Sequence, residues 1–404
     1  MSRNRTALVI GGGIAGPVAA TALVKAGIEA TVYEAYPEES NGIGGALALA
    51  PNGLAALGIV GADDAVCSIA KPIRHMAMSV DGKNLGRLPA IPDLPPLQAV
   101  DRGDLHRVLR ARALAAGVRF EYGKRLVDVD DGPAGITARF ADGSVADADV
   151  LIGADGVRST VRTLIDPNAP GPGYTGMLGF EGIADTTMDI DPDTMTSAFG
   201  KRAYYLYWAQ PGGGIKWGAN LPSRKYLSLT EARAVPAEEW LRTLRETYAD
   251  DVPGAELAAR TTTETLQVTG ALHIMPPVPH WYRGRMVLVG DAVHAPSNST
   301  GQGASLAIES AIELARCLRD LADPASAFAA YERLRRERVE RIAARGAKVN
   351  HAKTPGPVAR KAMSLLMPVM FKAINVEKMI GREQRYTIDW DAPVTAATTV
   401  TPAA

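Results

Sequence analysis

Cysteine, aromatic side chains and excess charge of either sign are all scarce in this sequence. Only two of the 404 residues are cysteines, Cys67 and Cys317, which excludes a disulfide-stapled fold and favours a reducing, cytoplasmic compartment. The 44 Lys and Arg residues are balanced by 44 Asp and Glu residues, so the net charge is zero. A neutral chain lacks the basic surface that nucleic-acid binding needs, and we expect no nucleic-acid partner.

Long hydrophobic runs and metal-ligand spacings are also missing. The polar start at Met1 to Thr6 fits no cleavable signal, and the weakly polar stretch 46–62 is broken by Pro51-Asn52-Gly53, so no membrane segment is expected. The histidines show no ligand spacing, which predicts no metal site; they stand at positions 75, 106, 273, 280, 294 and 351. No G-x-S-x-G pattern occurs, so hydrolase chemistry lacks its nucleophile.

The order of expected elements indicates a discontinuous chain of two main parts. Apolar strands alternate with helices near the N-terminus and again near Arg285–Asp320, which predicts an α/β, Rossmann-like parallel sheet. Between them, roughly 171–269 is richer in aromatic strands. We therefore expect a nucleotide-binding domain from 1–75, 98–170 and 270–345, a β-rich substrate domain from 76–97 and 171–269, C-terminal helices over 346–391, and a disordered tail over 392–404.

The glycine-rich segment Gly11 to Gly16 fits G-x-G-x-x-G between the strand 7–10 and an Ala-rich helix. Gly11 and Gly13 permit a tight turn and close approach of a pyrophosphate to the helix N-terminus. Glu34 ends the next strand, where an acid binds a ribose diol and repels a 2′-phosphate, so the nucleotide bound there is not NADP. The alternative is a glycine-rich turn that binds nothing.

A second match to the same pattern, Gly171 to Gly176, lacks a preceding strand and a following helix pattern. We interpret it as a loop. The sequence therefore predicts one dinucleotide fold rather than two.

Two further motifs indicate which dinucleotide is bound. Gly153-Ala154-Asp155-Gly156 follows the apolar run 150–152, and Gly290-Asp291 follows the strand 286–289 and precedes Gly301-Gln302-Gly303-Ala304. With these three motifs in this order, nearly the whole chain resembles the single-component (class A) FAD-dependent aromatic monooxygenases of the p-hydroxybenzoate hydroxylase type. The sequence departs from the family's pattern at Val293 and at the polar segment 295–300.

The resemblance implies a set of FAD-binding residues. They comprise Gly11, Gly13, Ala15 and Gly16 at the pyrophosphate, Glu34 and Ala35 at the adenosine ribose, Gly45 and Ala46 along the flavin, Arg102 reaching the cofactor, Leu126 near the adenine, Asp155 serving FAD and the nicotinamide nucleotide, Asp291 at the ribityl chain, and Gly301, Gln302, Gly303 and Ala304 at the flavin pyrimidine edge. A helix N-terminus at that edge would stabilise the negative charge of reduced flavin.

The resemblance also places the substrate between the flavin and the β-rich domain. The candidate strand 204–210 turns into 215–220, and period-two alternation separates its two faces without saying which one lines the site. Tyr205, Tyr207 and Trp217 are the candidate substrate contacts, and ordinary sheet packing is the alternative. Tyr205, Tyr207 and His294 are candidate acid–base groups, although His294 also fits a structural hydrogen-bonding role.

The implied reaction uses tightly bound FAD, transient NADH or NADPH, and O2. A flavin C4a-hydroperoxide would hydroxylate a small or polycyclic, phenol-like aromatic substrate, the cofactor supplying the chemistry and the protein the positioning. Epoxidation or Baeyer–Villiger oxygen insertion in the same fold, and a redox-silent FAD-binding protein, remain open, as do a monomer or a homodimer. The apolar segment 364–374 fits a lid, a docking helix or core.

Overall fold

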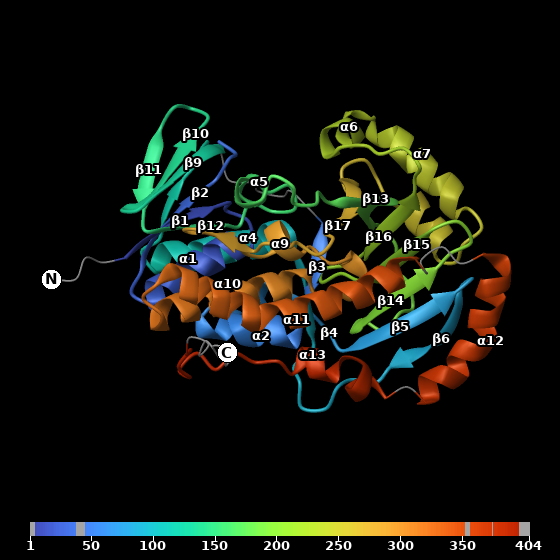
Figure 1. Cartoon of the computed structure of the whole chain (residues 1–404). Helices are drawn as coiled ribbons and strands as arrows, with labels where there is room; N and C mark the ends of the chain where they lie inside the picture. Colours follow the sequence, from blue (N-terminus) through green and yellow to red (C-terminus); the bar gives the residue numbers. More distant parts are fainter. Residues whose placement is uncertain (1–4, 38–44, 352–355, 374, 396–404) are drawn as a thin grey trace, which may run out of the picture.

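A six-stranded, mostly parallel sheet forms one half of the molecule in the computed structural model, which describes residues 5–37, 45–351, 356–373 and 375–395 (Figure 1). The central strands are almost wholly buried and apolar, as expected for a parallel sheet covered on both faces. In spatial order the strands are β18 (Tyr282–Arg283), β19 (Met286–Leu288), β12 (Val150–Gly153), β1 (Thr6–Ile10), β2 (Glu29–Tyr33) and β8 (Arg119–Glu121).

Helices cover this sheet, and the Ala-rich first helix packs closely against the long helix that begins at Gly303. Small side chains allow this close approach, and the resulting core is continuous with the sheet. The helices of this half are α1 (Ala15–Lys25), α2 (Pro51–Ile59), α3 (Asp63–Ile69), α4 (Arg102–Ala115), α5 (Thr160–Ile165), α9 (Asp291–His294), α10 (Gly303–Asp320) and α11 (Pro324–His351).

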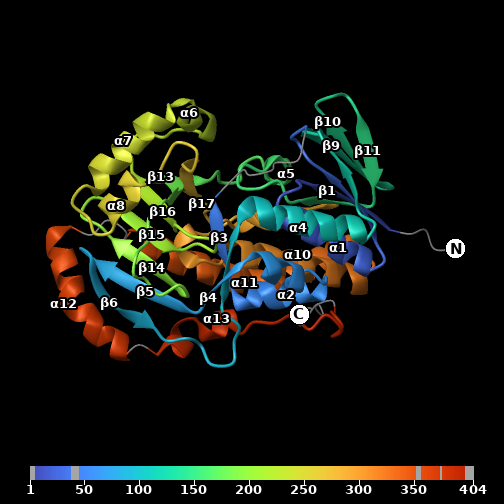
Figure 2. The same cartoon turned by 180° about the vertical axis from the view of Figure 1, so that it is seen from behind.

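Two small antiparallel sheets flank the same half. One, with β10 between its neighbours, consists of β9 (Leu126–Gly132), β10 (Gly135–Phe140) and β11 (Val145–Ala148). The other, with β7 in the middle, consists of β3 (Ala46–Leu49), β4 (Lys71–Ile73) and β7 (Leu97–Asp101), and it lies between the two halves of the molecule (Figure 2).

A seven-stranded sheet forms the second half, and two of its strands come from a much earlier part of the chain. Its order is β17 (Gln267–Ile274), β13 (Gly173–Ala184), β16 (Ile215–Pro222), β15 (Tyr204–Ala209), β14 (Thr194–Phe199), β5 (His75–Val80) and β6 (Lys83–Leu88). One face, here called the outer face, packs against α6 (Leu229–Ala234), α7 (Ala237–Tyr248) and α8 (Gly254–Ala259). The opposite, inner face is turned toward β3 and β7.

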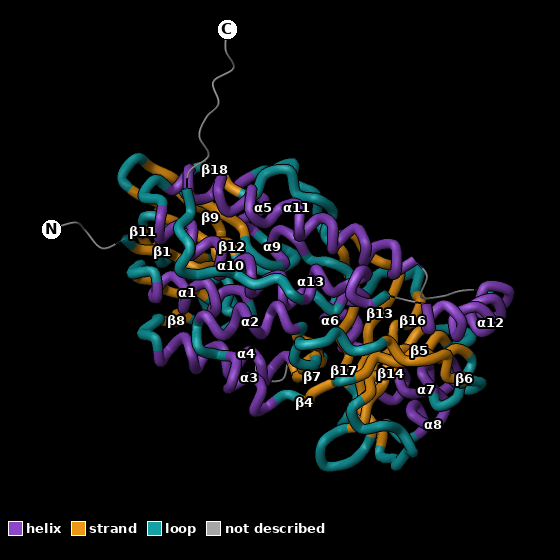
Figure 3. Tube along the Cα trace, turned by 90° about the horizontal axis from the view of Figure 1, so that it is seen from below, coloured by secondary structure: helices purple, strands orange, loops and turns teal. Residues whose placement is uncertain are grey.

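The chain ends in α12 (Pro357–Ala373), a π-helical turn at Glu377–Gly381 and α13 (Arg382–Gln384). Helix α12 lies at the far edge of the seven-stranded sheet (Figure 3) and packs Met363, Met367 and Phe371 against β5 and β6. Its other side exposes Leu365 and Val369. Part of the apolar segment at 364–374 is therefore core, and residue 374 and the tail from 396 onward lie outside the described residues.

One local expectation needs correction. The segment 171–176 is not a loop throughout, because β13 begins at Gly173 and pairs with β17 there. The lack of a preceding strand and of a following helix pattern suggested a loop, but pairing with β17 decides the conformation. Within the part of the chain that the structure describes, no helix is long and apolar enough to span a bilayer.

Candidate FAD and substrate site

Four neighbouring parallel strands end at the same edge of the six-stranded sheet, and each expected nucleotide motif follows one of them. Gly11 follows β1, Glu34 follows β2, Asp155 follows β12 and Asp291 follows β19. Ligands of open α/β sheets bind at this carboxyl edge, near the point where connections leave in opposite directions. The fold therefore brings these motifs together from positions up to 280 residues apart, as the positions 11 and 291 show.

The turn after β1 needs glycine at two positions and leaves a third open. Gly11 has φ +103°, and a Cβ there would lie 2.5 Å from the carbonyl oxygen of Ala154. A Cβ at Gly16 would lie 1.9 Å from the oxygen of Gly11. Gly13 is exposed and has no atom within 4 Å of its Cβ position, so a ligand can approach this backbone closely.

Glu34 holds this turn from the neighbouring strand. Its Oε2 accepts a hydrogen bond from Gly12 N at 2.7 Å, and its Oε1 accepts one from Tyr36 N at 3.0 Å. Nε2 of His106, on α4, lies 2.6 Å from the carbonyl oxygen of Gly12. The carboxylate is half-buried and stands where the sequence motif predicts a ribose contact, with Ala35 next to it.

Asp155 fixes the turn after β12 through its own side chain. Its carboxylate accepts hydrogen bonds from Ser159 Oγ at 2.5 Å, Thr160 N at 2.7 Å and Val161 N at 3.1 Å. Burial raises the pKa of this carboxyl, and these hydrogen bonds oppose the rise. The carboxylate thus anchors the start of α5, a structural task that the sequence motif alone did not reveal.

Asp291 is the residue whose surroundings best fit the hydroxyl groups of a cofactor chain. It lies deep in the protein yet keeps part of its surface accessible, and burial raises its pKa while Arg102 opposes the rise. Among the described residues, none donates a hydrogen bond to its carboxylate. A partly buried carboxylate without donors from the protein is unfavourable, and the ribityl hydroxyls of FAD are donors of the kind it lacks.

Helix α10 contacts Gly290, the residue that precedes Asp291. A Cβ at Gly290 would lie 3.0 Å from Ala15 Cβ and 3.3 Å from Ala307 Cβ, so the turn after β19 touches both α1 and α10. The first amides of α10, at Gly303 and Ala304, lack helical acceptors and favour a negative group. Gly301 precedes them in the left-handed conformation, with φ +60°.

Three other residues expected at the cofactor have mainly structural contacts. The side-chain oxygen of Gln302 accepts a hydrogen bond from Asn52 Nδ2 at 2.9 Å, so this buried amide points to α2. Leu126 and Ala15 are buried in the main core. A contact between these residues and FAD would have to come from their backbones, and it stays a prediction.

The three aromatic residues expected at the substrate lie on the outer face of the seven-stranded sheet. Tyr205, Tyr207 and Trp217 belong to the cluster packed against α7 and α8. The Trp217 Nε1 donates to Thr261 Oγ1 at 2.8 Å, and burial raises the pKa values of both tyrosines. Their placement argues against the expected substrate and acid–base roles, because these side chains face away from β3.

The inner face instead carries a row of partly accessible residues across five strands. Register places Glu181, Gly218, Leu206, Ser197 and Met78 side by side on β13, β16, β15, β14 and β5. Each keeps part of its surface accessible in the middle of the molecule. We call these five residues the inner row.

His294 is buried beneath the cofactor edge rather than aimed into it. Its Nε2 lies 2.9 Å from Ser310 Oγ on α10. Burial, reinforced by the nearby Arg335 guanidinium, lowers the pKa of His294 to about 3. The ring is therefore neutral at physiological pH and forms part of the packing, which supports the structural role over the acid–base role.

A polar group that sequence reasoning missed lies where the inner row meets β3. The Oε2 of Glu181 accepts a hydrogen bond from Ala46 N at 2.6 Å, and Lys216 Nζ forms an ion pair with Asp101. Burial raises the pKa of Glu181 to about 7; the Ala46 amide and Lys216 oppose the rise, and Asp101 adds to it. The only signal in the sequence is that the otherwise uncharged strands β13 and β16 each contain one charged residue, Glu181 and Lys216.

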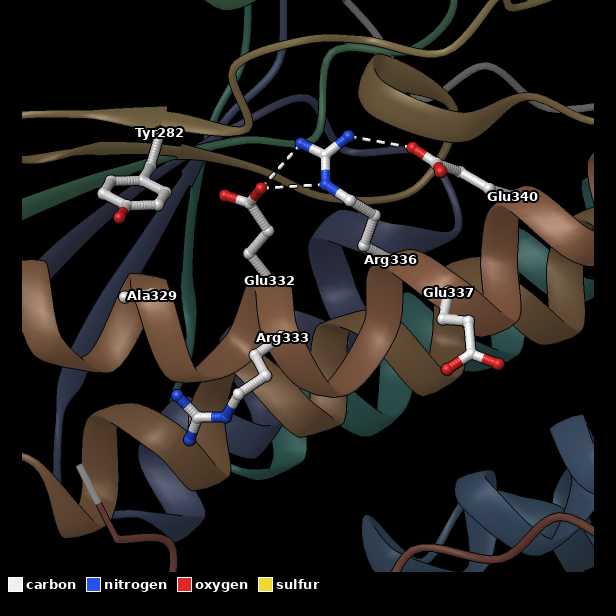
Figure 4. Close-up of a pocket in the computed structure, with 7 residues that line it drawn as sticks. All are labelled: Tyr282, Ala329, Glu332, Arg333, Arg336, Glu337 and Glu340. Atoms are coloured by element: carbon white, nitrogen blue, oxygen red, sulfur yellow. Dashed lines mark hydrogen bonds and ion pairs between the residues drawn. The ribbon is translucent and has the colours of Figure 1, made fainter. Parts of the chain in front are cut away.

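An open surface pocket of about 510 Å³ lies elsewhere, along α11 (Figure 4). Arg336 spans this surface with ion pairs to Glu332 and Glu340, and its guanidinium lies 5.0 Å from the Trp281 ring centroid. These are ordinary pairs one helical turn apart. They explain the surface of α11 without a ligand.

Comparison with known proteins gives concordant matches over most of the chain. Residues 4–346 match the family described as FAD binding domain. The 6-hydroxynicotinate 3-monooxygenase of Pseudomonas fluorescens is 31% identical over 371 residues, covering 85% of this chain and 90% of that protein. The FAD-dependent urate hydroxylase of Klebsiella pneumoniae is 30% identical over 361 residues, covering 86% and 91%.

A solved structure agrees with the fold as a whole. Klebsiella pneumoniae HpxO complexed with FAD and uric acid has a TM-score of 0.79 and 26% identity, covering 94% of this chain and 96% of that chain. This likeness confirms the predicted Rossmann-like FAD-binding fold with its second, β-rich half.

Proposed function

Because the chain belongs to the FAD binding domain family and is an FAD-dependent monooxygenase that hydroxylates aromatic substrates, we propose that its substrate is a small, planar, hydroxylated aromatic ring bound over the inner row. The relatives named above act on 6-hydroxynicotinate and urate, which are both flat, oxygen-bearing ring systems. NADH or NADPH serves as the reductant, as is typical of this family.

One observation carries the placement of the substrate. The inner row is the partly accessible part of a sheet face that looks toward Gly45–Ala46, the segment expected along the flavin. Leu206 offers an apolar surface for a ring, and Ser197 Oγ, which accepts a hydrogen bond from Tyr204 Oη at 2.9 Å, offers a polar group for a substituent. A pocket with an apolar floor and few polar groups suits a small aromatic molecule.

The chain's own residues prepare the site in three ways. FAD, when bound, supplies the redox and oxygen chemistry. The turn at Gly11–Gly16 and Glu34 would hold its dinucleotide part, Asp291 and Arg102 its ribityl region, and the start of α10 its flavin edge. A substrate bound over the inner row would exclude water from this edge, and the inner row would orient the substrate ring toward it.

An absorption spectrum of the purified protein tests the proposal first. We expect flavin bands that are bleached by NADH or NADPH, and faster bleaching when 6-hydroxynicotinate, urate or a simple phenol is added. Detection of a hydroxylated product by mass spectrometry would identify the accepted ring. Flavin that is bound but never reduced by either nicotinamide nucleotide, with any ring tested, would instead favour a redox-silent FAD-binding protein.

A further inference from the structure

Glu181, Lys216 and Asp101 join the seven-stranded sheet to the small sheet beside the cofactor site. Glu181 on β13 accepts the hydrogen bond of Ala46 N on β3, across 135 positions of sequence. Lys216 on β16 is 4% exposed and pairs with Asp101 at the end of β7, across 115 positions. Two side chains of one sheet therefore hold two strands of the other.

The backbone that they hold is the segment expected along the flavin. A Cβ placed on Gly45 would lie 1.8 Å from Glu181 Oε1, so the carboxylate packs directly on this glycine. The carbonyl oxygen of Gly45 accepts a hydrogen bond from Arg102 N at 3.2 Å, and Arg102 immediately follows Asp101. Gly45 and Ala46 are thus fixed from one side by Arg102 and from the other by Glu181.

We propose that Glu181 is a positioning residue through which the seven-stranded sheet holds the Gly45–Ala46 segment in the conformation that receives FAD. The inference rests on the proposed placement of FAD along this segment. Lys216 and Asp101 complete the link, because their ion pair fixes the start of α4, where Arg102 stands.

The link is sensitive to pH because the carboxylate changes its charge near neutrality. Burial raises the pKa of Glu181 to about 7, so the carboxyl is protonated below this pH and ionised above it. A hydrogen bond from an amide to an ionised carboxylate is about twice as strong as one to a neutral acceptor. Ala46 is therefore held more firmly above pH 7 than below it.

The charged groups that face Glu181 set the pH at which its carboxyl ionises. Lys216 on β16 stabilises the ionised form, and Asp101 on β7 disfavours it. Replacing Lys216 by methionine removes the stabilising charge and leaves the two carboxylates facing each other. This change moves the transition upward by about one pH unit.

The test compares FAD affinity at two pH values. Apoprotein is titrated with FAD at pH 6 and pH 8 by quenching of flavin fluorescence, for the natural chain, Glu181→Gln, Lys216→Met and the control Glu246→Gln, whose side chain is exposed on α7. The natural chain and the control should bind FAD about fivefold more tightly at pH 8 than at pH 6 through this link. Glu181→Gln keeps the length and the acceptor, so it should lose this difference and still bind FAD.

All other groups are the same in the natural chain and in each variant, so their contributions to the pH dependence cancel in the comparison. The same pH dependence in Glu181→Gln as in the natural chain overturns the inference. Lys216→Met tests the inference independently if the glutamine variant does not fold. Its upward-shifted transition should lower the ratio of FAD affinities between pH 8 and pH 6, and an unchanged ratio also overturns the inference. If the natural chain binds no FAD at either pH, the proposed function fails instead.

Discussion

Glu309 lies fully buried on α10 between two arginines of α11. Its carboxylate forms ion pairs with Arg335 at 2.6 Å and with Arg338 at 2.9 Å, and it accepts a hydrogen bond from Asn52 at 2.6 Å. Burial alone would raise the pKa of Glu309, but the two guanidiniums and the amide more than offset it and hold the pKa below its usual range. The paired charges thus join α2, α10 and α11 beneath the cofactor edge.

Glu309→Gln should therefore be strongly destabilising. The substitution leaves two buried guanidiniums without a counter-charge, and breaking a buried pair in this way costs about 3–5 kcal/mol. Urea unfolding at pH 7 measures the loss. Glu337→Gln on the neighbouring helix α11 is the control, because Glu337 is 89% exposed in its pair with Arg341 and should change stability by less than about 0.5 kcal/mol. Equal losses in the two variants would contradict the buried-pair explanation.

The lowered pKa of His294 predicts how the stability of the fold depends on pH. Its pKa is about 3 in the folded chain, lowered by burial and by Arg335, against an ordinary 6.5, so the unfolded chain binds the extra proton between these values. Stability therefore falls as the pH falls from 6.5 toward 3. His294→Gln should reduce the loss of unfolding free energy between pH 7 and pH 5 by about 2 kcal/mol. An identical loss in both proteins would show that another group titrates.

At the scale of elements, the side chains of strand β15 alternate between the inner face, where we place the substrate, and the outer face, which packs against helices. Leu206 belongs to the inner row, whereas Tyr207 points to the outer cluster with α7 and α8. Leu206→Ala should lower kcat/KM for the accepted aromatic substrate at least about tenfold, because it removes several apolar atoms from the ring surface. Steady-state kinetics with product detection measures this change.

The matched variant on the same strand is Tyr207→Phe. It removes only a hydroxyl from the outer cluster, so kcat/KM should stay within about twofold while stability falls by about 1 kcal/mol. The reverse pattern, with Tyr207 affecting catalysis and Leu206 only stability, would place the substrate on the outer face.

The same strand shows what the sequence can and cannot predict. The helix at 303–320 and the turn at 11–16 were predictable because each depends on residues that are neighbours in sequence. The faces of β15 were separable by alternation, but both are buried against other elements, so apolar character does not distinguish them. The link between Glu181 and Ala46 spans 135 positions and leaves no local pattern at all.

At the scale of the whole molecule, the chain passes repeatedly between its two halves. After β4 the chain passes into the seven-stranded sheet, where it forms β5 and β6, and it returns to the nucleotide-binding half with β7. It passes into the seven-stranded sheet again at β13 and returns after β17. The inner face also shares a buried cluster with β4 and β7, to which Ile73, Ala99 and Trp208 contribute. Such connections favour one cooperative unit over two that unfold separately.

FAD binding should therefore stabilise both halves together. Thermal unfolding followed by tryptophan fluorescence should show a single transition, because Trp217 reports on the seven-stranded sheet and Trp281 on the nucleotide-binding half. The transition temperature should rise with FAD concentration, by an amount equivalent to about 2.7 kcal/mol at a hundred times the dissociation constant. Two transitions, of which FAD shifts only one, would mean that the two halves unfold independently and that β3 and β7 transmit no stability between them.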